Sequence, residues 1–334
     1  TVTEGYNFLG NEADVTEVPN QALGKWYKDR DGYFYWGGGV EEGIAPVVLA
    51  DILPAEKINY QSHVGYLKKE WLTGNGKNTT VVLIDTGVNV TNSKFNAGLI
   101  SETDLTDGAS ADKDHGTFIC GLICGKGSFV TGVANDSKLV SIRYKDDITK
   151  LEKLLDNLVV ALNKVIELKQ NNPGLNLVVN MSQGLNKQQA LVFPEKIVSV
   201  TQAIKTLSSL DALLFCAAGE NRQLLEENLL FPALLPETIA VGCIEPEFAN
   251  LPFSKKVDFI SSLQEYRSYN KALEIVSDSG SSFSVAIMAA VSLLIKSTQL
   301  VSTKDEFKEA LQPFSRDVQN FRFNNTEYDF FINK

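Results

Sequence analysis

The chain has 334 residues, of which 44% are apolar and 22% are charged, and its formal net charge is −10. This composition is that of an ordinary globular protein and argues against wholesale disorder. The acidic balance argues against a nucleic-acid backbone or an anionic membrane surface as the main partner. The longest apolar run, Phe283 to Ile295, is shorter than the ~20 residues that a membrane span needs, so we expect no membrane span.

Residues 1–75 differ from the rest of the chain, and we expect them to form an N-terminal extension. The stretch KWYKDRDGYFYWGGG, Lys25 to Gly39, has aromatic residues on both sides of an Asp-Gly turn, which predicts a β-hairpin. Trp26, Trp36 and Trp71 all fall in this extension. Such an aromatic segment could bind a sugar or a peptide, although we favour aromatics that pack an appendage with little other core.

Residues 76–334 alternate apolar runs with amphipathic segments. The helix expected over Ile148 to Gln170 has leucines at helical spacing and stops at Pro173-Gly174. This alternation predicts an α/β domain with a mostly parallel central sheet and helices on both faces. The expected strands are 81–85, 139–144, 175–182, 212–218, 238–244 and 257–260. A short helix (STKDEFKEAL) and a strand-like stretch (FRFNNTEYDFFIN) are expected to close the same domain.

The four cysteines, Cys120, Cys124, Cys216 and Cys243, lie in apolar stretches without CxxC spacing. We therefore expect small core residues and no zinc or redox motif. No compact cluster of Asp, Asn and Glu is assigned as a metal site.

Three polar residues sit where chemistry is expected in such a sheet. His115 opens a predicted buried helix, which would hold its imidazole rigidly enough to serve as a general base. Asp85 ends the buried strand VVLID, where its carboxylate could orient and stabilise an imidazolium. Ser282 begins an Ala-rich helix, whose N-terminus would favour a developing oxyanion.

These three stretches, in chain order, resemble the subtilisin-like serine proteases, whose order is Asp, His, Ser. VVLIDTGVN, DHGTFICG and GSSFSVAIMAAVSLLI look like the motifs around the three catalytic residues of that family. Between them, LVVNMSQG, LLFCAAGEN and FPALLPETIAVGCIE resemble the substrate-binding strand, the strand to the oxyanion hole and the segment after it. The six segments cover about 220 residues, Lys77 to Ser297.

The resemblance implies a subtilisin-like fold and a serine endopeptidase that acts on peptides or proteins. Asp85 would be the orienting carboxylate, His115 the general base and then acid, and Ser282 the nucleophile. Ser182, Gln183 and Gly184 would pair with an extended substrate, and Ala217, Ala218 and Gly219 would form the opposite wall of the primary pocket.

The resemblance leaves three further matters open. Relatives often bind structural calcium, so calcium is possible here without an assigned ligand set. The first residues show no charged-then-apolar signal segment, and we expect any targeting peptide to have been removed. A secreted or cell-envelope location is favoured by the resemblance only.

Two positions depart from the family pattern. Leu230 falls where many relatives have Gly at the bottom of the primary pocket, which predicts a shallow pocket for small or medium side chains. Glu220 stands where relatives have the Asn whose amide donates to the oxyanion. A one-residue bulge could let Asn221 supply that amide, Glu220 could donate as a protonated carboxyl, or the oxyanion hole could be defective. We favour the bulge, with Asn221 as the donor.

Two other functions compete with the serine endopeptidase. Asp85-Thr86-Gly87 and Asp278-Ser279-Gly280 look like the paired motifs of pepsin-like aspartic proteases, although that fold is almost all β. A subtilase-like pseudoprotease that binds peptides or scaffolds an assembly is the non-enzymatic alternative.

Overall fold

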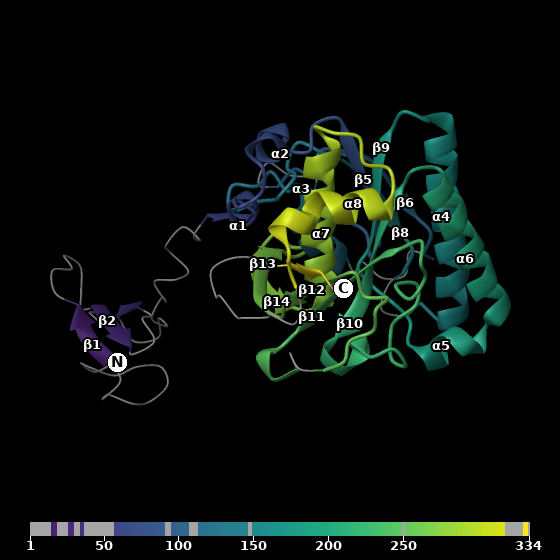
Figure 1. Ribbon diagram of the computed structural model, residues 1–334. Helices are drawn as coiled ribbons and strands as arrows, with labels where there is room; N and C mark the ends of the chain where they lie inside the picture. The colour runs from purple at the N-terminus through teal and green to yellow at the C-terminus, as the bar shows by residue number, and fades with distance from the viewer. Residues whose placement is uncertain are drawn as a thin grey trace. The chain divides into compact units, whose positions relative to one another are not determined.

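The computed structural model describes residues 15–18, 26–29, 34–36, 57–90, 95–106, 113–145, 149–248, 251–317 and 330–332 (Figure 1). The chain divides into two compact units, Thr1–Glu56 and Lys57–Lys334. Residues 57–75, which the sequence analysis grouped with the extension, belong to the second unit. Tyr60 and Trp71 are 2% and 1% exposed in its core, where Trp71 packs against Phe314.

The first unit contains a small antiparallel sheet. Its strands are β1 (Val15–Val18), β2 (Trp26–Asp29) and β3 (Phe34–Trp36), paired in the order β1-β2-β3. The antiparallel pairing of β2 with β3, which sets Trp26 opposite Trp36, is the predicted hairpin. The side chains of this aromatic segment lie outside the described residues, so its expected role in packing or binding stays a prediction.

The second unit is built on a nine-stranded sheet in the order β15-β16-β12-β11-β10-β9-β5-β8-β6. The seven strands from β12 to β6 are parallel, as the alternating sequence predicts, and β16 runs antiparallel beside β12. The bounds are β5 (Thr79–Asp85), β6 (Leu99–Asp104), β8 (Lys138–Arg143), β9 (Asn176–Met181), β10 (Leu213–Glu220), β11 (Ile239–Ile244), β12 (Phe259–Ser262), β15 (Arg316–Asp317) and β16 (Phe330–Ile332).

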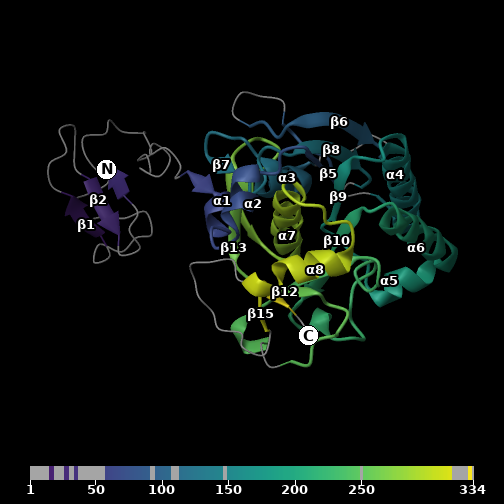
Figure 2. The same cartoon turned by 45° about the horizontal axis from the view of Figure 1, so that its top comes forward.

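Helices cover both faces of this sheet (Figures 1 and 2). Helices α3 (Asp114–Cys124) and α7 (Ser281–Lys296) pack on one face, and α4 (Leu151–Asn171) and α6 (Pro194–Ser209) on the other. Alternate residues of a strand enter the two cores, as Val81 and Leu83 enter one while Val82 and Ile84 enter the other. The sequence therefore folds as the predicted three-layer α/β domain.

The remaining elements are short. They comprise β4 (Ile58–Asn59), α1 (Tyr60–His63), α2 (Lys69–Gly74), β7 (Val130–Thr131), α5 (Lys187–Val192), α8 (Lys304–Leu311), the antiparallel pair β13 (Glu265–Tyr269) and β14 (Ile275–Ser279), and the 3-10 turns η3 (Asn221–Leu224), η4 (Pro246–Phe248) and η5 (Gln312–Phe314).

The four cysteines are free and buried, which confirms that they are core residues. Among the described helices, none combines the length and the apolar character that a membrane crossing requires.

Candidate active site

Asp85 and His115 form the centre of the candidate site. Asp85 is the last residue of β5, and His115 is the second residue of α3. The Nδ1 atom of His115 lies 2.8 Å from Oδ1 of Asp85, which also accepts a 2.7 Å hydrogen bond from the Thr86 N–H. Burial alone would raise the pKa of the Asp85 carboxyl, but His115, Lys145 and the Thr86 N–H together hold that pKa below its usual value. Asp85 is therefore a buried carboxylate at neutral pH.

The start of α3 is fixed against the loop that follows β5. The N–H of Gly116 donates to Thr86 Oγ1 at 3.0 Å. A Cβ atom on Gly116 would lie only 2.1 Å from the Gly87 carbonyl oxygen, so no larger residue fits there. This close approach places the imidazole of His115 next to the carboxylate of Asp85. The His115 side chain is still 24% exposed.

Ser282 lies at the N-terminal end of α7. Its Oγ donates a 2.6 Å hydrogen bond to the carbonyl oxygen of Ser182, while Ser182 Oγ donates to the carbonyl oxygen of Ser282 at 2.9 Å. The Asn180 amide in turn donates to Ser182 Oγ at 2.8 Å. In the described part of the chain no hydrogen bond joins Ser282 to His115. The hydroxyl thus points at the segment that was expected to bind substrate.

Phe283 packs between the helices that carry His115 and Ser282. Its ring centroid lies 6.0 Å from that of His115, 4.7 Å from Phe118 and 5.6 Å from Tyr266. The side chain is 3% exposed, so the bulky residue after Ser282 fills the space behind the imidazole. The contact between Phe283 and His115 joins residues 168 positions apart and was not predicted from the sequence.

The side chain of Asn221, the expected oxyanion donor, is bound by Glu245 in the structure. The Asn221 amide donates to Glu245 Oε1 at 2.9 Å, and its Oδ1 accepts from the Glu245 N–H at 2.9 Å. The strand contains a register shift, which falls between Ala217 and Gly219. The Oε1 atom of Glu220 lies 2.8 Å from the Ser281 nitrogen.

Of the segments expected to bind substrate, the one that begins at Ser182 contacts Ser282 directly. Gly184 approaches Leu230 so closely that a Cβ on Gly184 would lie 2.7 Å from the Leu230 Cβ. An antiparallel bridge between Leu185 and Phe231, with two 2.8 Å hydrogen bonds, holds these two segments together. Burial also covers the segment expected to form the opposite wall of the pocket, Ala217, Ala218 and Gly219. Since these residues have small side chains or none, a substrate would meet their backbone atoms.

Two hollows flank these residues. One, of about 210 Å³, is lined by Gln183, Gly184 and Leu185 together with Tyr144 and Lys145. Another, of about 400 Å³, is lined by His115, Phe118, Asp278 and Phe283. One hollow is thus lined by the expected base, His115, and the other by Gln183 and Gly184 of the segment expected to bind substrate.

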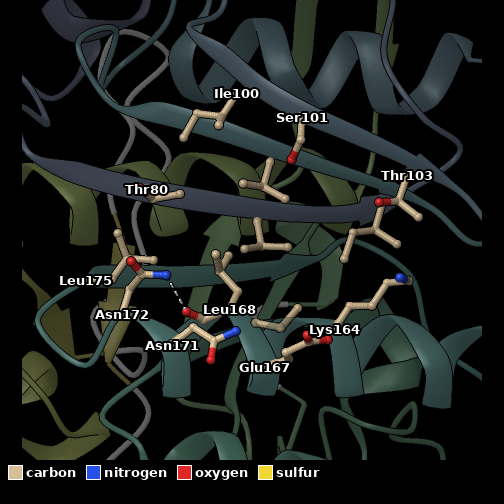
Figure 3. Close-up of a pocket in the computed structure, with 14 residues that line it drawn as sticks. Thr80, Ile100, Ser101, Thr103, Lys164, Glu167, Leu168, Asn171, Asn172 and Leu175 are labelled. Atoms are coloured by element: carbon tan, nitrogen blue, oxygen red, sulfur yellow. Dashed lines mark hydrogen bonds between the residues drawn. The ribbon is translucent and has the colours of Figure 1, made fainter.

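A separate hollow of about 440 Å³ lies between α4 and the face of β5, β6 and β8 (Figure 3). Ile100, Lys164 and Glu167 project into it, and the Asn172 amide donates to the Leu168 carbonyl oxygen at its edge. None of the candidate catalytic residues lines this hollow. Among the described residues, no group of three or more His, Cys, Asp or Glu side chains is arranged to hold a metal ion.

The family profile described as "Subtilase family" (Peptidase_S8) matches residues 76–326. The chain therefore belongs to the subtilase family, as the motifs indicated. Membership in this family and the parallel α/β sheet exclude the pepsin-like interpretation of Asp85 and Asp278, which needs an almost all-β fold.

The relatives are distant and are serine or alkaline proteases by name. "Alkaline protease 1" of Aspergillus oryzae is 24% identical over 72% of this chain and 55% of its own length. The "Major intracellular serine protease" of Bacillus subtilis is 23% identical over 72% of this chain and 75% of its own. The chain thus spans little more than half of the Aspergillus protein.

Solved structures share the fold. One is described as the crystal structure of a cold adapted subtilisin-like serine proteinase, with a TM-score of 0.56, 22% identity, and coverage of 77% of this chain and 89% of that one. The other, "S41 Psychrophilic Protease", has a TM-score of 0.58, 19% identity, and coverage of 71% and 83%.

Proposed function

We propose that this chain is a serine endopeptidase that hydrolyses peptide bonds through an acyl-enzyme on Ser282. The observation that carries the proposal is the 2.8 Å hydrogen bond between the buried Asp85 carboxylate and His115. Ser282 is the second residue of α7, which contacts His115 through Phe283. The proposed nucleophile, base and orienting carboxylate thus come from α7, α3 and β5, that is, from the sheet and from the two helices packed on one of its faces.

The reaction starts with rotation of the Ser282 hydroxyl from the Ser182 carbonyl oxygen toward Nε2 of His115. Catalytic hydrogen bonds are often loose before substrate binds and tighten in the complex. Ser282 Oγ then attacks the substrate carbonyl carbon, and its proton passes to His115. Asp85 stabilises the resulting imidazolium, and His115 returns the proton to the leaving amine. Water hydrolyses the acyl-enzyme by the same route in reverse.

The substrate is a peptide or protein segment in extended form. Ser182, Gln183 and Gly184 offer it backbone groups for pairing as an added strand. The contact of Leu230 with Gly184 supports a shallow primary pocket, so we expect cleavage after small or medium side chains. Cleavage mainly after Phe or Tyr would contradict this specificity.

One observation favours a second candidate function. A carboxylate, Glu220, stands at the start of α7, where a serine protease needs a hydrogen-bond donor for the oxyanion. An ionised Glu220 would repel the oxyanion and leave a domain that binds peptides without cleaving them.

A peptide library digested by the native chain and by Ser282→Ala separates the two functions, with Ser279→Ala as the matched control. Ser279 is an exposed serine at the end of β14, three residues before Ser282. The endopeptidase proposal expects cleavage by the native chain and the control only. Peptide binding without cleavage by the native chain would support the scaffold.

A further inference from the structure

The loop that follows Asp85 is held by two charged side chains outside the candidate triad. The N–H of Val88 donates to Glu102 Oε2 at 3.1 Å, and the carbonyl oxygen of Val88 accepts from Lys113 Nζ at 3.2 Å. Lys113 Nζ also lies 2.5 Å from Glu102 Oε1. Both backbone polar groups of one loop residue are therefore bound by the two members of an ion pair. We call Val88, Glu102 and Lys113 the Val88 clamp.

The Val88 clamp joins three elements around the candidate site. Glu102 lies in β6, the edge strand of the sheet, and Lys113 is the N-cap of α3, two residues before His115. Val88 follows the last residue of β5, Asp85, by three positions. The clamp thus ties the strand that ends in the carboxylate to the helix that carries the imidazole.

The Asp85 carboxylate depends on this loop for its orientation. Its Oδ1 accepts from the Thr86 N–H and lies against Nδ1 of His115. Its Oδ2 is buried and has no hydrogen-bond partner among the described residues. Thr86 also holds α3, because its Oγ1 accepts from the Gly116 N–H. A shift of the loop would therefore move the carboxylate and the imidazole relative to each other.

Lys113 is an unusual residue for the position that it occupies. Helix N-caps favour Ser, Thr, Asp or Asn, and a cation there opposes the positive end of the helix dipole. Lys113 makes no capping hydrogen bond through its side chain, which instead contacts Glu102 and Val88. The loop and α3 are also joined by the Asn89 N–H, which donates to Thr117 Oγ1 at 2.9 Å. Such a departure from a local rule is expected at functional sites.

The exposure of the ion pair argues against a role in stability alone. The Lys113 and Glu102 side chains are 30% and 22% exposed, and ion pairs near the surface add little to stability. Their position has a larger effect on a reaction, because a displacement of a catalytic group by about 1 Å can cost about 100-fold in rate. The clamp lies where such a displacement would begin.

We propose that Glu102 and Lys113 are positioning residues, which keep Asp85 and His115 at hydrogen-bond distance by binding both backbone groups of Val88. This inference rests on the proposed peptidase function. Neither side chain makes a bond to substrate or transfers a proton. Both act through the contact between Asp85 Oδ1 and His115 Nδ1, which must persist when the imidazole becomes cationic. Loss of either should lower kcat and leave KM near its native value.

The Glu102→Gln variant keeps the shape of the carboxyl but removes the charge that holds Lys113. We expect kcat to fall about tenfold at unchanged KM, measured on a peptide that the native chain cleaves. Lys113→Arg, which keeps a cation of similar reach, should retain most of the native kcat. The urea midpoints of both variants should stay near that of the native chain.

Asp156→Asn is the matched control for Glu102→Gln. Its carboxylate also lies 2.5 Å from a lysine, Lys196, but this pair joins α4 and α6 on the other face of the sheet. We expect this variant to keep the native kcat. A loss of kcat as large as that of Glu102→Gln would show that any lost ion pair slows the enzyme, and would overturn the positioning role.

A charge reversal separates the clamp from an ordinary ion pair. Glu102→Lys combined with Lys113→Glu restores opposite charges. A lysine at position 102 cannot accept from the Val88 N–H, and a carboxylate at position 113 cannot donate to the Val88 carbonyl oxygen. We therefore expect kcat to stay low in the double variant. Recovery of the native kcat would mean that the charge pair suffices, and would refute the clamp on Val88.

The proton between Asp85 Oδ1 and His115 Nδ1 gives a readout that does not need turnover. Its ¹H NMR resonance should lie far downfield in the native chain and in Asp156→Asn, and should broaden or move upfield in Glu102→Gln. An unchanged resonance or an unchanged kcat in Glu102→Gln would overturn the inference. A native chain that neither cleaves peptides nor reacts with a fluorophosphonate would refute the peptidase function. The resonance would then still decide whether the clamp holds the bond between Asp85 and His115.

Discussion

Oδ1 of Asp85 lies 2.8 Å from Nδ1 of His115, joining the buried end of β5 to the first turn of α3. This bond selects the tautomer with the proton on Nδ1, which leaves Nε2 free to act as a base. It also ties a carboxylate with a depressed pKa to an imidazole that must become cationic during the reaction.

Asp85→Asn should therefore lower kcat by about 10⁴-fold with little change in KM, because an amide favours the wrong tautomer and cannot stabilise the imidazolium. Asp278→Asn is the matched control, since Asp278 lines the hollow beside His115 from β14. We expect the control to stay within a few-fold of the native rate. Equal losses in the two variants would argue that both carboxylates take part.

Phe283→Leu should reduce kcat about tenfold at unchanged KM, because the imidazole loses the ring packed behind it. Phe307→Leu is a control of the same chemistry, as Phe307 is fully buried against Phe215 and Phe259 away from the site. Both variants should lose a similar free energy of unfolding, about 1 kcal/mol. An equal fall of kcat in both variants would mean that Phe283 acts on stability only. If Phe283 acts through its ring contact with His115, the Phe283→Tyr variant, which keeps a ring, should have a kcat near that of the native chain.

Leu230→Ala should widen the specificity of cleavage. The Leu230 side chain approaches Gly184, and removing its outer atoms opens the floor between the two segments. We expect kcat/KM for peptides with Phe or Leu before the scissile bond to rise at least tenfold relative to peptides with Ala there. A change of about tenfold is what one or two methylene groups contribute in an apolar pocket. An unchanged preference would place the primary pocket elsewhere.

Asn221→Gly should leave kcat within a few-fold of native, because the Asn221 amide is engaged by Glu245. Glycine suits the φ of 47° at this position, so the change removes the side chain without backbone strain. Two hydrogen bonds are lost, and the free energy of unfolding should fall by about 1–3 kcal/mol in denaturant titrations. A loss of turnover on the order of 100-fold, the scale of one oxyanion donor, would restore Asn221 to that role.

Lys296 gives the fold a stability that depends on pH. Burial, and then the charge of Lys169, lower its pKa to about 8, although its ammonium donates to the Val301 carbonyl oxygen. Below pH 8 both states are protonated and the cost of burying the charge is fully present. Between pH 8 and about 10.5 the unfolded state holds more protons, so the free energy of unfolding rises with pH, by at most about 1.4 kcal/mol per unit.

The comparison of native chain with Lys296→Met in urea at pH 7.5, 8.5 and 9.5 isolates this group. We expect the stability of the variant relative to the native chain to decline as pH rises. A difference that stays constant over this range would mean that Lys296 keeps an ordinary pKa.

The strands of the parallel sheet were predictable because burial on both faces demands continuous apolar runs such as VVLI and LLFCAA. Strand β6 escaped prediction because it is the sheet edge, and its sequence LISETD is partly exposed. The unit boundary near residue 56 was hidden because Tyr60 and Trp71 find their partners far along the chain, at Arg267 and Phe314.

The candidate site shows the same division. Asp85, His115 and Ser282 could be named as candidates because each stands at the end of an apolar element, where an open α/β sheet keeps its chemistry. The direction of the Asn221 side chain could not be predicted from the sequence. Its partner, Glu245, lies 24 residues later, directly after the neighbouring strand β11. Side-chain direction at a strand end depends on such partners, and local sequence does not encode them.

The most direct test of the account is the mass of the intact protein after incubation with a fluorophosphonate at acid and neutral pH, beside Ser282→Ala. A serine peptidase should gain one phosphonyl adduct, mapped by peptide sequencing to Ser282, and the folded variant should gain none. An unmodified native chain, or equal labelling of the variant, would contradict a nucleophilic Ser282.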